Sequence, residues 1–289
     1  MLLRVFVHVL ISLCDVGWTV SHPNLVRLLG WATSTECPMV IQEYLAGKAL
    51  DHQLYVEKWR PTEEDVLKIG LDVARGMEYL HTAFVNLTNH TVPVIHRDLK
   101  SPNLLLLYPP DSSSGGGERQ QVWVKIADFG LARNKKLDEA SRGRAVQTGM
   151  MTGCGSVLWM APEILLGDTY NEKVDVFSYA MCLAELRSGY LPWQGGKSRI
   201  DTTQVPYKVT RGQRPTWQLT KGRDKEVKKD FLNALIQRCW DQTPSRRPEF
   251  QTIADEIGKQ YTAAMRGMRR GSITIDDRPP SPPVIGGSE

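Results

Sequence analysis

The sequence has few cysteines, and none of them are spaced as a metal or redox pair. Its 289 residues include five cysteines, an odd number, and they lie far apart. A disulfide framework needs paired cysteines, and common zinc sites need Cys-x-x-Cys spacing. We therefore expect free thiols in a reducing compartment and a cytoplasmic protein. The cysteines are Cys14, Cys37, Cys154, Cys182 and Cys239.

The sequence also lacks a hydrophobic run that could cross a membrane, and it lacks a strong charge of either sign. The apolar stretch at residues 1–13 is too short to span a bilayer and is interrupted by Arg4 and His8. The formal net charge is only +4, which is usual for a solvated surface. We expect neither a membrane nor nucleic acid as a partner.

Hydrophobic periodicity predicts strands first and helices later. Two short apolar runs within residues 21–46 predict a pair of strands. The pair Pro61 and Thr62, followed by two glutamates, is typical of a helix start, and apolar residues then recur at helical spacing. Further helical patterns lie at 162–187 and 225–263. This order predicts an α+β arrangement with a helical bulk.

Between these helices, the pattern changes to that of a hairpin. Residues 104–107 and 122–126 predict its two strands, and residues 109–121 between them hold runs of three serines and three glycines. Such a stretch is typical of a surface insertion. Residues 271–289 are rich in proline, glycine and serine and have too little apolar content to fold, which predicts disorder.

Four short motifs carry the chemical information. One tripeptide such as Asp-Phe-Gly arises often by chance and then forms an ordinary turn, but four motifs in one order at these separations are hard to obtain by accident. The four motifs are His-Arg-Asp-Leu-Lys-Ser-Pro-Asn at 96–103, Asp-Phe-Gly at 128–130, Trp-Met-Ala-Pro-Glu at 159–163 and Arg-Arg-Pro at 246–248. In these motifs the sequence resembles the protein kinase family, over about residues 21–263.

The resemblance implies a protein-kinase-like α+β fold, with a mainly helical C-terminal lobe and a truncated N-terminal lobe sheet. Residues 21–46 would be a remnant of the N-terminal lobe with the hinge, and residues 47–263 would form the C-terminal lobe. Residues 1–20 are a segment of uncertain structure, and residues 264–289 would be a disordered tail.

The resemblance also implies roles for the catalytic residues, with ATP and Mg²⁺ as cofactors. Asp98 would accept the proton of the substrate hydroxyl, and Lys100 would steady the γ-phosphate. Asn103 and Asp128 would offer oxygen ligands to magnesium, which prefers oxygen. Phe129 and Gly130 would let Asp128 swing in and out.

The adenine site would lie in the linker after the second strand. Gln42 sits at the position that controls the pocket, and Glu43 and Leu45 would offer backbone groups to the adenine edge. Gly47 would permit close approach of the ring. Leu105 would form the pocket floor.

Other positions match residues that order the activation segment. Arg97 would pair with a phosphate placed on Thr148 or Thr152 by an upstream activating kinase; the alternative is a mobile basic loop without a switch. Ser156 would bridge Asp98 and Lys100. Within the remaining matches, Leu28, His96 and Phe129 fit an apolar column between the lobes, Asp175 would hold the catalytic loop, and Glu163 would pair with Arg247.

The sequence Lys-Ser-Pro-Asn at 100–103, together with the Trp-Met-Ala-Pro-Glu motif, resembles the tyrosine-kinase-like group, which mostly phosphorylates serine and threonine. Lys100 itself favours serine/threonine specificity. The implied function is transfer of the ATP γ-phosphate to Ser/Thr hydroxyls of protein substrates. The sequence departs from the family before residue 48, because the first lysine is Lys48 and Gly17 is the one glycine before His22. No glycine-rich loop, strand lysine or helix glutamate precedes the hinge.

Three explanations fit this departure. The chain could be a truncated kinase fragment, a catalytically impaired pseudokinase-like scaffold, or one part of a site completed by another chain. The intact residues Asp98, Lys100, Asn103 and Asp128 argue against long degeneration and favour the first explanation.

Overall fold

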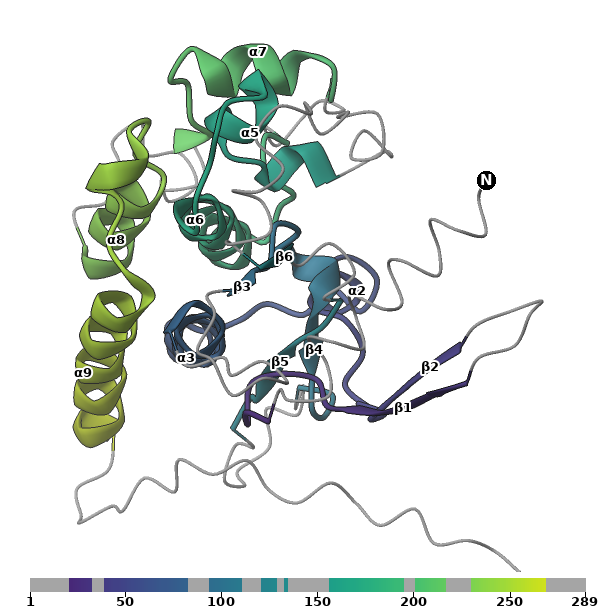
Figure 1. Cartoon of the computed structure of the whole chain (residues 1–289). Coiled ribbons are helices and arrows are strands. Elements are labelled where there is room, and N and C mark those ends of the chain that lie inside the picture. Colours follow the sequence, from purple (N-terminus) through teal and green to yellow (C-terminus); the bar gives the residue numbers. More distant parts are fainter. Residues whose placement is uncertain are drawn as a thin grey trace, which may run out of the picture.

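The computed structural model of the chain describes residues 21–32, 39–82, 94–110, 121–128, 133–134, 156–194, 201–216 and 230–268 (Figure 1). Four residues of the predicted activation segment, Phe129, Gly130, Thr148 and Thr152, lie outside this part of the chain, as do residues 1–20 and 269–289.

The described part combines short strands with longer helices, which confirms the predicted α+β class. The strands pair as antiparallel two-stranded sheets, β1 with β2, β3 with β6 and β4 with β5, and the last pair is the predicted hairpin. The strands are β1 Leu28–Ala32, β2 Met39–Gln42, β3 Val94–Ile95, β4 Leu104–Leu106, β5 Val124–Ile126 and β6 Arg133–Asn134. The helices are α2 Leu50–Tyr55, α3 Glu63–Thr82, α5 Pro162–Leu166, α6 Lys173–Ser188, α7 Gln204–Thr210, α8 Phe231–Cys239 and α9 Phe250–Met268.

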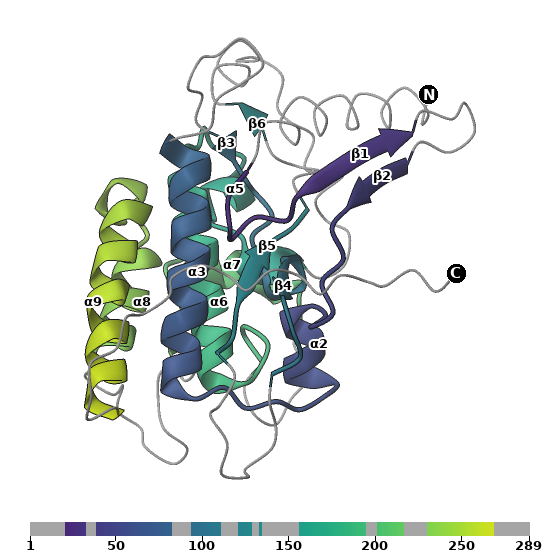
Figure 2. The ribbon, with the colours of Figure 1, turned by 90° about the horizontal axis from the view of Figure 1, so that it is seen from below.

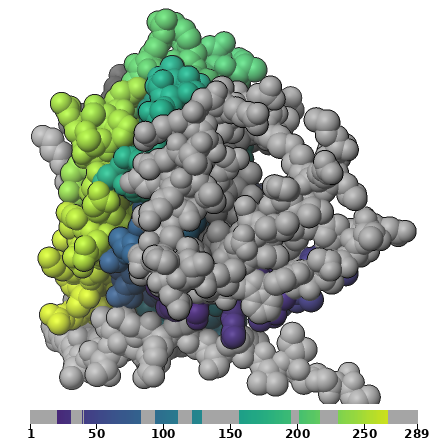
Figure 3. All heavy atoms as spheres, viewed as in Figure 1, coloured from purple at the N-terminus to yellow at the C-terminus, as the bar shows by residue number. Residues whose placement is uncertain are grey.

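Helix α6 is the centre of the helical body. Every residue from Lys173 to Leu186 is buried, as expected of a helix that is enclosed on all sides. Helix α3 runs beside it, and α9 packs along the other side of α3 (Figures 1 and 2). In the space-filling view, α9 forms one flank of the molecule and α7 lies at its top (Figure 3). Any polar side chain between Lys173 and Leu186 is therefore removed from water and needs partners.

Helix α3 begins where the sequence predicts. The backbone N–H of Thr62 donates to Asp65 Oδ2 over 2.8 Å, and the N–H of Asp65 donates to Thr62 Oγ1 over 3.3 Å. This reciprocal pair is a capping box, which satisfies two N–H groups that the helix cannot.

The helical patterns at 162–187 and 225–263 are each interrupted. Gly167 ends α5 in the left-handed region with φ of 73°, which glycine adopts without steric cost. Pro244 and Pro248 lie between α8 and α9, and proline cannot donate a helical hydrogen bond. Helix α9 then continues to Met268, past residue 263 where the expected lobe ended.

The β1–β2 hairpin projects from the helical body (Figure 2). It is joined there through residues 24–26, since the N–H of Val26 donates to Ile126 O over 2.9 Å and the N–H of Ile126 donates to Asn24 O over 2.8 Å. Leu29, Met39 and Ile41 are each more than half exposed. The hairpin is thus the truncated N-terminal sheet that the resemblance implied, with apolar side chains in contact with solvent.

Candidate active site

The segment from His96 to Asn103 lies between β3 and β4, and we call it the catalytic loop after its predicted role. Helix α6 holds its first residues. The backbone N–H groups of His96 and Arg97 donate to the two carboxylate oxygens of Asp175, each over 2.8 Å. His81 from α3 lies 2.9 Å from the same carboxylate through Nε2. Asp175 therefore holds the loop backbone, as the resemblance implied.

The charge of Asp175 is kept by these donors. Burial by itself raises the pKa of this carboxyl, but the hydrogen bond from His81, the charges of His81 and His96 and the N–H of Arg97 outweigh burial. The pKa of Asp175 consequently lies below its ordinary value of 3.8. Arg97 has φ of 69°, a conformation that costs free energy for any residue with a side chain, and the bond to Asp175 helps to stabilise it.

Three polar groups predicted for phosphate transfer meet within the loop. Lys100 Nζ lies 2.7 Å from Asp98 Oδ2 and 2.7 Å from Ser156 Oγ. Asn103 Nδ2 donates to the backbone oxygen of Asp98 over 2.7 Å and to Asp98 Oδ2 over 3.2 Å. The structure therefore brings Asp98, Lys100, Asn103 and Ser156 together. Lys100 occupies the middle of this group, where the resemblance had implied Ser156 as the bridge.

His96 connects this group to the strand that leads to Asp128. Its Nδ1 accepts the N–H of Asp98 over 3.3 Å, and its Nε2 donates to the carbonyl of Ala127 over 3.1 Å. The imidazole ring of His96 thus links the backbone of the catalytic loop to the end of β5. The N–H of Ala127 also donates to Asn103 O over 2.8 Å, so the residue before Asp128 is held against the catalytic loop.

Asp128 itself is exposed and has φ of 64°, in the left-handed region. Together with Arg97, it places a non-glycine residue in this region at each of the two loops. Such conformations are uncommon and are concentrated at functional sites. Asp98 and Asp128 thus extend from two loops that a single histidine ties together.

The predicted adenine linker is attached to neighbouring segments through the side chain of Glu43. Glu43 Oε1 accepts the N–H of Arg27 over 2.8 Å and Lys125 Nζ over 2.6 Å, which attaches the linker to β5. The side chain of Gln42 is exposed, whereas Leu45 is buried. Leu105 is half-buried beside the small apolar cluster that contains Leu45.

Gly47 has a packing role that the sequence reasoning missed. A Cβ at this position would lie 2.4 Å from Tyr108 O and 2.5 Å from Leu106 O, which are backbone atoms that cannot move aside easily. The linker therefore needs glycine here to pack against β4, independently of any bound ring.

The predicted pair of Glu163 and Arg247 is formed and buried. Arg247 Nη1 and Nη2 donate to the two oxygens of Glu163 over 2.6 and 2.9 Å. Arg247 also donates to the carbonyls of Asp241 and Lys173, over 2.8 and 2.9 Å. This bidentate ion pair between Arg247 and Glu163 joins the start of α5 to the turn before α9.

Glu185 is a site residue that the motifs did not reveal. It is fully buried on α6, and its carboxylate accepts three hydrogen bonds, from Tyr55 Oη over 2.6 Å, Ser101 Oγ over 2.6 Å and Trp159 Nε1 over 2.9 Å. Burial raises its pKa to about 7, although the three donors act in the opposite direction. A lone glutamate in an otherwise apolar helical stretch was the available signal.

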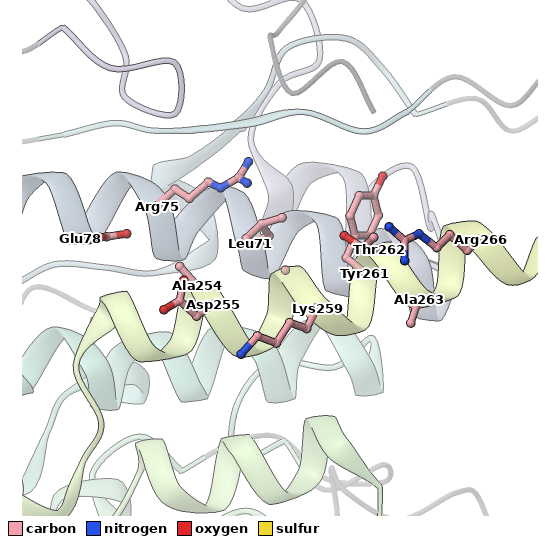
Figure 4. A pocket seen from close by; sticks show the side chains of 11 residues that line it. Leu71, Arg75, Glu78, Ala254, Asp255, Lys259, Tyr261, Thr262, Ala263 and Arg266 are labelled. Atoms are coloured by element: carbon pink, nitrogen blue, oxygen red, sulfur yellow. The ribbon is translucent and has the colours of Figure 1, made fainter. Parts of the chain in front are cut away.

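A groove of about 520 Å³ lies elsewhere, between α3 and α9 (Figure 4). Its lining includes charges of both signs, such as Arg75, Glu78 and Arg266. No predicted site residue lines it, so its volume is unrelated to the phosphate-transfer residues.

Further observations concern thiols, metals and membranes. Cys182 and Cys239 are buried free thiols, as predicted, while the other three cysteines lie outside the described residues. Within the described ranges, no group of three or more His, Cys, Asp or Glu side chains is arranged to hold a metal. The helices described here include none long and apolar enough to cross a membrane.

Comparison with known proteins agrees with this geometry. Residues 12–257 match the protein tyrosine and serine/threonine kinase family. The probable serine/threonine-protein kinase drkD of Dictyostelium discoideum is 36% identical over 243 residues, which cover 83% of this chain and 16% of that protein. Serine/threonine-protein kinase VIK of Arabidopsis thaliana is 36% identical over 239 residues, 82% of this chain and 47% of that protein.

Mitogen-activated protein kinase kinase kinase 11 of Homo sapiens is 32% identical over 253 residues, covering 88% of this chain and 26% of that protein. The chain thus spans less than half of the length of each of these three relatives. The length of the match, the four motifs and the loop geometry lead to one conclusion: this chain belongs to the protein tyrosine and serine/threonine kinase family.

Proposed function

We propose that this chain transfers the γ-phosphoryl group of ATP to serine and threonine hydroxyls of protein substrates, with Mg²⁺ as the metal. The observation that carries the proposal is the pair of contacts made by the His96 ring, which connect the backbone of Asp98 to the carbonyl of Ala127, the residue before Asp128. Such a reaction depends on positioning and charge stabilisation, and both need the two loops to face one site. The relatives named as serine/threonine kinases support the choice of hydroxyl.

Asp98 is the residue we assign to the attacking hydroxyl. Its Oδ2 is held by Lys100 and Asn103, so Oδ1 is the oxygen we assign to the substrate proton. Lys100 carries the positive charge next to this carboxylate and would steady the transferred phosphate. Its contact with Ser156 joins it to the 3-10 helix Ser156–Trp159, which precedes α5 in the chain.

Asn103 and Asp128 fit magnesium by the chemistry of their donors. The amide nitrogen of Asn103 is committed to Asp98, which leaves its Oδ1 for a cation. Mg²⁺ is held by few protein oxygens together with phosphate and water, so two such residues suffice. Bound magnesium would neutralise charge on the phosphate oxygens. Gln42, Glu43, Leu45, Gly47 and Leu105 remain our proposed adenine contacts.

Regulation by phosphorylation is supported by Arg97. Its guanidinium is buried and donates through Nη1 to Tyr170 Oη over 3.1 Å, while Nε has no hydrogen-bond partner among the described residues. A phosphate on Thr148 or Thr152, added by an upstream kinase, would pair with this cation. Replacing both threonines with alanine should then lower activity, and unchanged activity would exclude this switch. The two free thiols favour a reducing, cytoplasmic location.

Phosphate transfer from labelled ATP to a generic basic protein tests the function directly. The wild-type chain should transfer label with Mg²⁺ present, and Asp98→Asn should reduce the rate by about 10²-fold or more, because the proton acceptor is lost. A parallel thermal-shift measurement with Mg²⁺ and ATP detects binding alone. Binding without transfer by the wild-type chain would overturn the proposal and leave a nucleotide-binding scaffold.

A further inference from the structure

The groove between α3 and α9 is open because one face of α9 carries short side chains (Figure 4). Ala254, Gly258 and Thr262 recur every four residues, which places them on one stripe of the helix. Outside its own helix, a Cβ added to Gly258 would meet only Leu71 Cδ1 of α3 among the described residues, at 3.7 Å. The stripe therefore leaves a channel along α9 with room for an extended peptide.

The charges along this groove follow an order. Figure 4 places Arg266 at one end, Glu78 and Asp255 at the other, and Arg75 and Lys259 in between. Burial raises the pKa of Glu78, and the charge of the neighbouring Asp255 raises it further. Lys259 and Arg266 are exposed on α9, and Arg75 is half-buried on α3. From the end of α9 inward, positive charges thus come first and negative charges last.

The sequence that follows α9 has a complementary order of side chains. Helix α9 ends at Met268, two residues after Arg266. Residues 271–278, outside the described part of the chain, read Gly-Ser-Ile-Thr-Ile-Asp-Asp-Arg. Their two isoleucines alternate with hydroxyl residues, as in an extended peptide with one apolar face, and two acids and an arginine follow. A segment with so few apolar residues cannot fold alone, but it can become ordered on binding a surface.

We propose that residues 271–278 bind in the groove of the same chain, running back along α9 and fastening it to α3. From Arg266 to Asp255, α9 extends over eleven residues, or about 16 Å. Five extended residues cover the same length, at about 3.3 Å each. The segment is therefore long enough to turn at Gly271, where glycine permits a turn without steric cost, and to reach the far end of the groove. This inference is independent of phosphate transfer.

The order of charges favours this direction of binding. On the returning segment the two isoleucines come first and lie over the stripe of short side chains. The two acids come next, level with the positive charges of Lys259 and Arg75. Arg278 comes last and meets Glu78 and Asp255, where the groove is acidic. A peptide lying in the opposite direction would bring like charges together, which disfavours it.

Carbodiimide coupling of the full chain tests the contact, because this zero-length reagent joins an amine to a carboxylate only where the two touch. Mass spectrometry of the digested protein should show Lys259 coupled to Asp276 or Asp277. The matched control combines Lys259→Arg with Gln260→Lys. It keeps the positive charge in the groove and moves the amine to an exposed neighbour that does not line the groove and points about 100° away around the helix.

Coupling between α9 and the segment should be about tenfold weaker in the control than in the wild type. The reason is that a docked segment holds its carboxylates near Lys259 at an effective concentration well above that of a free tether. Equal coupling in the two proteins would overturn the proposal, since it would show a segment that meets all exposed amines of α9 alike.

Two further measurements identify the occupant and its pairing. In a mixture of isotope-labelled and unlabelled protein, the coupled peptides should be wholly labelled or wholly unlabelled. Pairs of mixed label would show that a second copy supplies the segment, which would overturn binding within one chain. A charge-swapped variant, Lys259→Asp combined with Asp276→Lys and Asp277→Lys, should still couple, with amine and carboxylate exchanged. Loss of coupling in this variant would contradict the proposed pairing.

Discussion

Helix α6 and the β1–β2 hairpin differ in the environment of their side chains. Asp175 and Glu185 on α6 are fully buried, and each carboxylate accepts several hydrogen bonds. On the hairpin, Met39 and Ile41 are more than half exposed. The loop that carries the proposed phosphate-transfer residues is therefore held by contacts with α6, and the hydrogen bonds described above for it include none from the hairpin.

This difference in burial determines how much free energy a substitution should cost in each region. A buried charge that loses its partner cannot recover its hydration, whereas an exposed side chain has little to lose. Substitutions around α6 should thus have large effects, and substitutions on the hairpin small ones. The adenine linker lies between the two regions and should show intermediate sensitivity.

The largest effect is expected at the Glu163–Arg247 pair, which packs against the helical body. Arg247→Met keeps an apolar stem but leaves the Glu163 carboxylate buried without its partner. We expect the free energy of unfolding, measured with chemical denaturant, to fall by about 3–5 kcal/mol. The control is Arg238→Met, which breaks a more exposed pair with Glu256 and should cost about 1 kcal/mol or less. Similar losses for both variants would remove the distinction between buried and exposed regions.

The next effect is a dependence of stability on pH that comes from Glu185. Its pKa of about 7 in the folded chain lies above its ordinary value of 4.5, so the folded state retains a proton that the unfolded state releases. This stabilising contribution is fully present below pH 4.5 and is lost as the pH rises through 7. The difference corresponds to roughly 3 kcal/mol.

Glu185→Gln removes this titration. Denaturation midpoints between pH 4.5 and 8 should therefore show the wild type losing stability relative to the variant as pH rises. Tyr55 and Cys182 beside Glu185 stay protonated in this range, since burial raises the pKa of both. Asp51 is the other charge that acts on Glu185, and it raises the pKa of this carboxyl further. Parallel stability curves for the two proteins would show that Glu185 does not titrate there.

An intermediate effect is expected at Gly47 in the linker. Gly47→Ala places a Cβ against the backbone of Leu106 and Tyr108, which should cost about 1–3 kcal/mol by overpacking. Gly30→Ala is the matched control, because a Cβ on Gly30 in β1 meets nothing within 4 Å. Thermal unfolding of both variants measures the difference. Equal stability of the two variants would mean that the linker adjusts to the added Cβ without loss of stability.

The smallest effect is expected on the hairpin itself. Ile41→Thr replaces a side chain that is 51% exposed and keeps the β-branched shape that strands favour. The free energy of unfolding should change by less than about 0.5 kcal/mol. A loss of 2 kcal/mol or more, on the scale of a buried apolar side chain, would show that this face is covered and would break the comparison.

Much of the fold could be predicted from local pattern. Thr62 and Asp65 form a capping box because the residues that cap a helix are its immediate neighbours in sequence. The hairpin of β4 and β5 follows from two apolar runs around a loop-forming stretch. The helical patterns at 162–187 and 225–263 contain helices as expected, but the breaks near Gly167 and Pro244 come from a backbone conformation and a missing donor that periodicity does not show.

The sequence by itself determined which groups carry the proposed chemistry, because the motif around Asp98 is short and its residues contact one another directly. The tertiary structure alone decided what holds that motif. Glu185 lies 84 residues from Ser101 and 130 from Tyr55 along the chain, and no local pattern encodes such a contact. The need for glycine at position 47 likewise arises only when the linker packs against β4. Both follow from burial, which brings distant polar groups and backbone together and leaves them no water to bind.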